Sequence, residues 1–143
     1  MTEPVPAVLA LDPGHRKCGL AVVAADGAIA THVVVAAEDI GPAAARAMLA
    51  LPADLRVQRI ILGDGTRSAE ARAQLAAALP DLPIDTVNET GSTLAARDRY
   101  WREHPPRGLW RLVPTSLRVP PEPYDDWVAV LLGERYWAGR ANP

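Results

Sequence analysis

The sequence has few cysteines and no long apolar run, which excludes several common classes of protein. Cys18 is the only cysteine among 143 residues, which excludes an internal disulfide framework and a zinc site built on cysteine. No apolar run reaches the ~18 residues of a membrane-spanning helix, and the N-terminus lacks a basic region followed by an apolar stretch. We therefore expect a cytoplasmic protein with no membrane partner. Its length predicts a single domain, residues 1–143, with one buried core.

A uniformly basic surface is also absent, because the net charge is −2 and the isoelectric point is about 5.9. The charge is nevertheless uneven. Residues 97–118 carry six arginines and only two acids, a local net charge of +4. An anionic partner such as nucleic acid therefore remains compatible with the composition.

Apolar runs and turn residues predict the order of the secondary structure. Three short apolar runs separated by Gly and Pro turns predict a β-meander, at residues 8–12, 19–25 and 29–36. Helices and strands then alternate, over residues 41–51 (helix), 59–62 (strand), 66 or 68 to 79 (helix), 83–87 (strand) and 90–103 (helix). A proline-rich connector over 104–123 precedes a last helix that ends near Trp137. This order predicts an α/β fold with a mixed five-stranded sheet, three antiparallel strands followed by strand–helix crossovers, flanked by helices.

Carboxylates stand at the ends of these elements. Asp12 ends the first strand, Glu89 follows the last strand, and Asp125 and Asp126 begin the last helix. Taken singly, Asp12 can start a turn and the other acids can favour a helix N-terminus. Brought together at one sheet edge, they would repel one another unless hard cations lay between them. Oxygen ligands suit Mg²⁺ or Mn²⁺, and no pair of histidines has the spacing of a zinc site.

Four segments, in order along the chain, resemble motifs of one family. Residues 9–23, with the turn Asp12-Pro13-Gly14 and a glycine at position 19, resemble the first motif of RuvC-like resolvases. Residues 61–66 and 87–97 are similar to the second and third motifs of the YqgF/RuvX family and of the YqgF-type domain of the transcription factor Tex. Residues 124–136 resemble the terminal motif. The third motif departs from the usual Asp-Glu-Arg, since it reads Asn88-Glu89-Thr90 here.

The resemblance implies an RNase H-like fold and a divalent-metal-dependent nuclease. Asp12, Glu89 and Asp125 fall on the positions of the family's acidic triad, and Asp126 would assist through water. Two Mg²⁺ or Mn²⁺ ions would be held, with Asp12 bridging both, Glu89 binding one and Asp125 the other. Two ions in this arrangement activate water and stabilise the leaving oxygen of a phosphodiester. The alignment leaves open whether Asp125 or Asp126 is the principal ligand.

The family points to three possible roles. The first is a RuvX-type Holliday junction resolvase, which cleaves branched DNA and, needing two opposed sites, acts as a homodimer. The second is a nuclease that processes the precursor of 16S ribosomal RNA, a structured RNA. The third is a YqgF-type module that binds nucleic acid without catalysis.

Basic and aromatic residues near these motifs are candidates for contacts to nucleic acid. Arg16 and Lys17 follow the Asp12 turn, and a helix N-terminus at 66–68 offers N–H groups to a phosphate. Residues 97–111 interleave guanidinium and aromatic groups, which suits backbone contacts and base stacking. A solvated turn, helix capping and core anchoring are the alternative explanations. The predicted nucleic-acid-binding residues are Arg16, Lys17, Thr66, Arg67, Ser68, Arg97, Arg107, Trp110 and Arg111.

Overall fold

The strands form one sheet in the computed structural model, which describes residues 3–65, 67–89, 91–114, 120 and 123–141. The strands are β1 (Val5–Asp12), β2 (Lys17–Ala24), β3 (Ile29–Ala36), β4 (Leu55–Gly63) and β5 (Ile84–Val87). Their order across the sheet is β3-β2-β1-β4-β5. β2 pairs antiparallel with β1 and β3, whereas β4 pairs parallel with β1 and β5. The predicted mixed five-stranded sheet is therefore confirmed.

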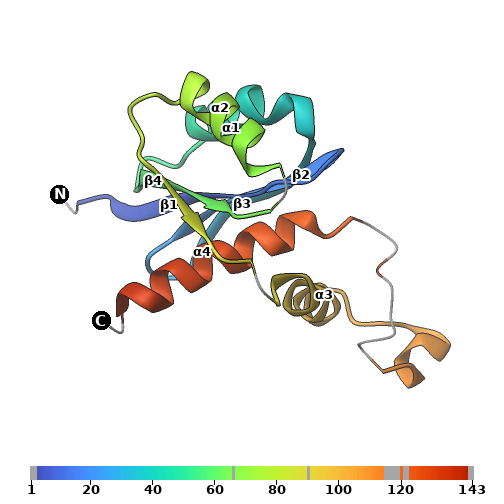
Figure 1. Ribbon diagram of the computed structural model, residues 1–143. Helices are drawn as coiled ribbons and strands as arrows, with labels where there is room; N and C mark the ends of the chain where they lie inside the picture. The colour runs from blue at the N-terminus through green and yellow to red at the C-terminus, as the bar shows by residue number, and fades with distance from the viewer. Residues whose placement is uncertain (1–2, 66, 90, 115–119, 121–122, 142–143) are drawn as a thin grey trace.

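Helices cover both faces of this sheet (Figure 1). α1 (Ile40–Leu49) and α2 (Ser68–Ala78) lie on one face, and α3 (Ser92–Glu103) and α4 (Asp125–Ala141) lie on the other. Two short 3₁₀ segments, η1 (Ala37–Asp39) and η2 (Gly108–Leu112), complete the described elements. None of the described helices combines the length and the apolar character needed to cross a membrane.

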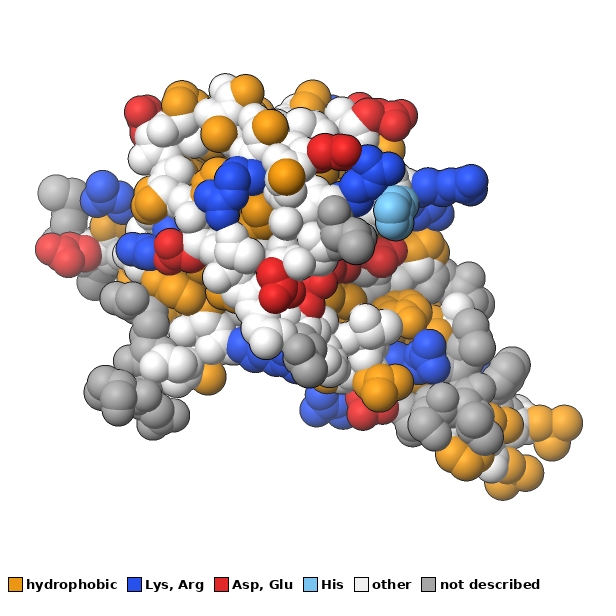
Figure 2. Space-filling view, viewed as in Figure 1, with side chains coloured by type: hydrophobic (Ala, Val, Ile, Leu, Met, Phe, Trp, Pro, Cys, Tyr) orange, Lys and Arg blue, Asp and Glu red, His pale blue; other side chains and the backbone are white. Residues whose placement is uncertain are grey.

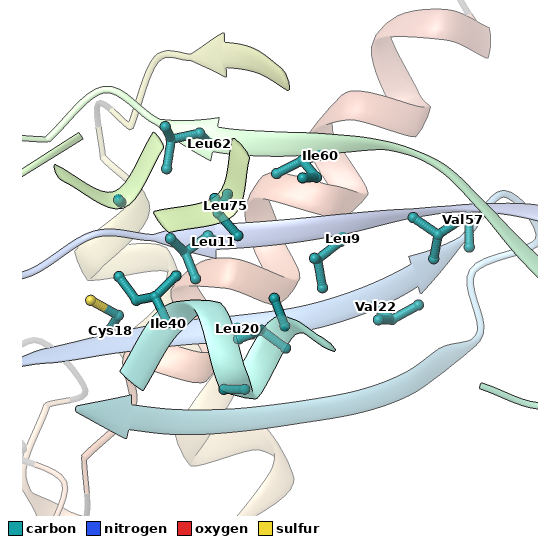
Figure 3. Packing of buried hydrophobic residues seen from close by; sticks show 14 of the residues in the cluster. Leu9, Leu11, Cys18, Leu20, Val22, Ile40, Val57, Ile60, Leu62 and Leu75 are labelled. Carbon is teal, nitrogen blue, oxygen red and sulfur yellow. The ribbon is translucent and has the colours of Figure 1, made fainter. Parts of the chain in front are cut away.

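Period-two alternation along the central strand builds two cores. Leu9 and Leu11 of β1 face α1 and α2, where they pack with Leu20, Ile60 and Leu62 of neighbouring strands (Figure 3). The intervening residues of β1 face the opposite way, into a second core with α3 and α4. All five of the named side chains are fully buried, so the centre of the sheet is a rigid platform for whatever stands at the strand ends.

Several boundaries differ from those predicted. β1 and β4 begin further toward the N-terminus than predicted. Pro6 in β1 and Arg56 in β4 interrupt the apolar pattern there. The proline-rich connector contains η2, and α4 continues to Ala141. α2 begins at Ser68 without a side-chain cap, so Ser68 does not serve as the cap residue suggested by its type; Thr66 lies outside the described residues.

Candidate active site

The candidate carboxylates come from three elements that meet at one edge of the sheet. Asp12 is the last residue of β1, and Glu89 comes two residues after the end of β5. Because β1, β4 and β5 run parallel, their carboxyl ends share an edge. α4 begins at Asp125 on the face that also carries α3. In Figure 2, acidic side chains gather at the centre of the surface, between the two helical layers.

Gly19 allows α4 to reach this edge. It pairs with Asp12 across β1 and β2. A Cβ atom at Gly19 would lie only 1.8 Å from the backbone oxygen of Asp125, and backbone atoms cannot easily move aside. The first turn of α4 therefore rests directly on the glycine that stands opposite Asp12.

Gly63 leaves room for the Glu89 side chain, as Gly19 does for α4. A Cβ atom at Gly63, the last residue of β4, would lie 1.8 Å from Glu89 Oε1. The Glu89 backbone N–H donates to Asp64 Oδ1 at 3.1 Å, and the Asp64 N–H donates to the Val87 carbonyl at 3.0 Å. These two bonds fix the loop after β5 and leave the Glu89 carboxylate over the end of β4.

Asp12 and Glu89 form a close carboxyl pair. Burial, together with a hydrogen bond with the Glu89 side chain and repulsion from Glu89 and Asp125, raises the pKa of Asp12 to about 8. Two carboxyl groups can hydrogen-bond only if one carries a proton. Glu89 Oε1 is also buried and has no hydrogen-bond partner. A partly desolvated pair of carboxyl groups of this kind is suited to bind a cation.

Asp125 and Asp126 are adjacent in sequence but differ in their surroundings. Burial and the neighbouring Asp126 raise the pKa of Asp125, while the positive charge of Lys17 lowers it. Asp126 has both oxygens engaged: Oδ2 lies 2.7 Å from Nδ1 of His32, and Oδ1 accepts the Trp127 N–H at 3.1 Å. Asp125 is therefore the acid that acts on Asp12, and Asp126 is held toward β3.

His32 is a residue that the sequence patterns do not mark. It lies on β3, 94 residues from Asp126, and its ring packs on Trp127 with centroids 4.6 Å apart. The only sequence signal is a histidine within an apolar strand, which does not reveal its partner. His32 ties the first turn of α4 to the outer strand of the sheet.

The donor set fits a hard divalent cation, although the carboxylates do not form a complete cage. Among the described residues, no group of three or more His, Cys, Asp or Glu side chains is arranged to hold a metal ion. The structure brings together Asp12 and Glu89, with Asp125 close enough to raise the Asp12 pKa. The oxygen ligands, the unpartnered buried oxygen and the mutual repulsion match what Mg²⁺ or Mn²⁺ would satisfy.

Comparison with known proteins identifies the family and the fold. The family profile of the Tex protein YqgF-like domain matches residues 6–106. The chain belongs to this family. Two solved structures of Thermus thermophilus RuvC share its fold: one in complex with a Holliday junction substrate (TM-score 0.56) and one described as the RuvC structure (TM-score 0.53). Each is 15% identical in sequence, and each alignment covers 95% of this chain and 96% of RuvC. No curated protein sequence matches the chain.

These comparisons confirm the predicted YqgF and RuvC resemblance and the RNase H-like fold. In this YqgF-like domain, the predicted nucleic-acid-binding residues have unequal surroundings. Arg16 and Lys17 are exposed and line a cavity of about 360 Å³ together with residues of β3 and Pro123. The guanidinium of Arg67 already makes hydrogen bonds within the protein, since it donates to His15 Nδ1 at 3.1 Å and to both oxygens of Glu70.

The arginines of residues 97–111 divide into two groups. Arg97 donates to the Tyr124 hydroxyl at 3.2 Å and lies over its ring, so it joins α3 to the start of α4. Arg107 and Arg111 are exposed in and beside η2. The side chain of Trp110 lies outside what the structure describes. Arg102, in the last turn of α3, is exposed as well, so the exposed basic surface spans the end of α3 and the connector, whereas Arg97 ties α3 to the start of α4.

The raised pKa of Asp12 predicts how stability depends on pH in metal-free protein. The folded state keeps the Asp12 proton up to about pH 8, whereas an ordinary Asp loses it near 3.8. The folded state thus binds more protons than the unfolded state between these values, and stability falls as pH rises from about 4 to 8. Replacing Asp12 with Asn removes this penalty. We expect Asp12→Asn to raise the free energy of unfolding by on the order of 2–3 kcal/mol at pH 8 and by little at pH 4.

The measurement is thermal unfolding of both proteins in chelator at pH 4, 6 and 8. Adding Mn²⁺ at pH 8 should then raise the melting temperature of the parent protein and leave that of Asp12→Asn nearly unchanged. A stability difference between the two proteins that is constant with pH would mean that Asp12 titrates normally.

Proposed function

We propose that this YqgF-like domain is a divalent-metal-dependent nuclease that hydrolyses phosphodiester bonds in structured nucleic acid. The observation that carries the proposal is the half-buried Asp12–Glu89 carboxyl pair at the carboxyl ends of β1 and β5, with Asp125 of α4 close enough to act on Asp12. Structural side chains rarely place a group of acids where they destabilise one another, whereas active sites do so regularly.

Each residue has a distinct part in the proposed reaction. Asp12, Glu89 and Asp125 would hold the cations, with Asp12 between the other two. A bound Mg²⁺ or Mn²⁺ pair supplies Lewis acidity and an activated water. Lys17, whose charge acts on Asp125, would hold a phosphate of the substrate beside the carboxylates. Arg16 follows the same turn and would extend this contact along the backbone of the nucleic acid.

The most specific form of the proposal is a RuvX-type resolvase of Holliday junctions. It draws support from the shared fold, since one RuvC structure is a complex with a Holliday junction substrate. Two cuts placed symmetrically on a junction require two copies of the site, so the proposal includes a homodimer on the DNA. Processing of a ribosomal RNA precursor would need only one copy.

A non-catalytic role is the second candidate. It is favoured by the lack of a complete three-ligand arrangement among the described residues and by the family's link to Tex. A module of this kind would bind nucleic acid and leave it intact.

One experiment separates these roles. The purified protein is incubated with Mn²⁺ and, in parallel, with a four-way DNA junction, a duplex of the same length and a structured RNA. We expect paired, chelator-sensitive cuts near the branch of the junction. Cleavage of RNA alone would assign the processing role. Binding without cleavage of any substrate, in both Mg²⁺ and Mn²⁺, would assign the non-catalytic role.

The connector arginines give a prediction about affinity. Replacing Arg107 and Arg111 with Ala should flatten the slope of log affinity against log salt by roughly 2 on duplex DNA, and by less on single strands, because each phosphate contact releases counterions. Arg46→Ala/Arg56→Ala is the matched control, since both arginines are exposed and lie on α1 and at the start of β4. If the connector is only a structural strap, the melting temperature will fall and the slope will stay the same.

A further inference from the structure

The 3₁₀ segment η2 exposes two leucines between α3 and α4. Leu109 is 82% exposed and Leu112 is 81% exposed. Residues three apart in a 3₁₀ helix lie on the same side, so these two side chains form one apolar tip. In Figure 1 this segment extends away from the sheet, and Figure 2 shows hydrophobic side chains protruding at the same end of the molecule.

The charges around this apolar tip indicate which kind of partner it would bind. Arg107 precedes η2 and Arg111 lies within it, both exposed, and η2 contains no acid. An apolar pair flanked by guanidinium groups suits a partner with an anionic backbone and stackable apolar faces. Nucleic acid has both, and leucine is among the residues that enter between base steps as wedges.

The position of η2 links the tip to the candidate active site. α3 begins three residues after Glu89, and α4 begins at Asp125. The connector that carries η2 therefore leads from the C-terminal end of α3 to the first turn of α4, which begins with the candidate ligand Asp125.

We propose that Leu109 and Leu112 form a wedge that enters the nucleic acid where base stacking is interrupted. Opening a base step costs least where strands branch or bases are unpaired. The wedge would thus make the protein prefer branch points to continuous duplex. This inference rests on the proposed function, because it assumes that nucleic acid is the substrate.

The test compares Leu109→Ala/Leu112→Ala with Leu49→Ala. Leu49 is 89% exposed at the end of α1, on the opposite face of the sheet, so its loss removes a similar side chain from an unrelated surface. Binding is measured by fluorescence anisotropy in chelator, where cleavage cannot occur. The ligands are a four-way junction with 2-aminopurine at the branch and an uninterrupted duplex of equal length.

We expect the parent protein and Leu49→Ala to bind the junction more tightly than the duplex and to increase 2-aminopurine fluorescence. The double variant should lose roughly 5- to 30-fold in junction affinity, change duplex affinity less than about twofold and give no fluorescence increase. Because the replaced side chains are exposed, its melting temperature should match that of the parent protein.

Other results would overturn the wedge. An unchanged junction preference in the double variant, or an equal loss on both ligands, would do so. Loss of a dimer by the double variant in sedimentation velocity, with junction preference kept, would assign the leucines to a second copy of the chain. A parent protein that binds neither ligand would overturn both the wedge and the proposed function. Wedge-dependent binding without metal-dependent cleavage would overturn only the nuclease.

Discussion

Replacing Asp12 with Asn is expected to reduce the single-turnover rate of phosphodiester cleavage by about 100-fold or more, on the order of 3 kcal/mol of transition-state stabilisation. Asn has the shape of Asp and lacks the negative charge. The site would then have one negative charge fewer to bind the cations, while the space occupied by the Asp12 side chain would stay filled. Glu89→Gln should have a similar effect, because its partly buried carboxyl group contacts Asp12.

Asp81→Asn is the matched control for both variants. Asp81 is exposed and precedes β5, at the opposite edge of the sheet from the candidate site. It should cleave at the parent rate. Calorimetric titration with Mn²⁺ should show weaker binding for Asp12→Asn and Glu89→Gln, and junction binding in chelator should be retained. Cleavage close to the parent rate in these two variants would remove the assignment of the carboxyl pair as catalytic.

The second large effect is expected at the start of α4. Asp125→Asn should be almost inactive, because Asp125 is the acid that repels Asp12 and lies near Lys17. Asp126→Asn should lose no more than about tenfold, since Asn can still accept the Trp127 N–H and face His32. The measurement is the cleavage rate as a function of Mn²⁺ concentration for each variant.

His32→Ala provides the control for this assignment. If Asp126 acts by holding the helix, His32→Ala and Asp126→Ala should weaken cleavage to a similar extent, and the double variant should add little. The opposite pattern, an inactive Asp126→Asn and an active Asp125→Asn, would mean that Asp126 turns from His32 to the cations.

The placement of Asp12 and Glu89 can be predicted from the sequence. The placement of the residues that support the site cannot. An acid after an apolar strand is visible in the sequence, and parallel strands bring such acids to one edge. The boundaries of β3 match the prediction because β-branched residues fill it and turns bound it. The family motifs add the expectation of a third acid on α4.

Contacts between distant segments account for what the sequence does not reveal. Gly19 and Gly63 stand within the family motifs, yet the sequence does not reveal that α4 and Glu89 occupy the space of their missing Cβ atoms. The bond from His32 to Asp126 depends on the side on which α4 crosses β3. Arg99 belongs to the basic segment, yet it pairs with Glu134 at 2.8 Å and Glu103 at 3.2 Å and lies over Trp127, so burial against α4 decides its role.

The close contact of α4 with Gly19 would also govern when the proposed nuclease becomes active during its synthesis. Asp12 and Glu89 leave the ribosome with β1 to β5, and the sheet edge can form around them. Asp125 follows only after the connector, 113 positions behind Asp12 in the chain. Contacts of such long range close late in folding, because the intervening chain must first be ordered. A nascent chain that already displays the carboxyl pair would therefore lack Asp125, and with it the proposed nuclease activity, until helix α4 has docked.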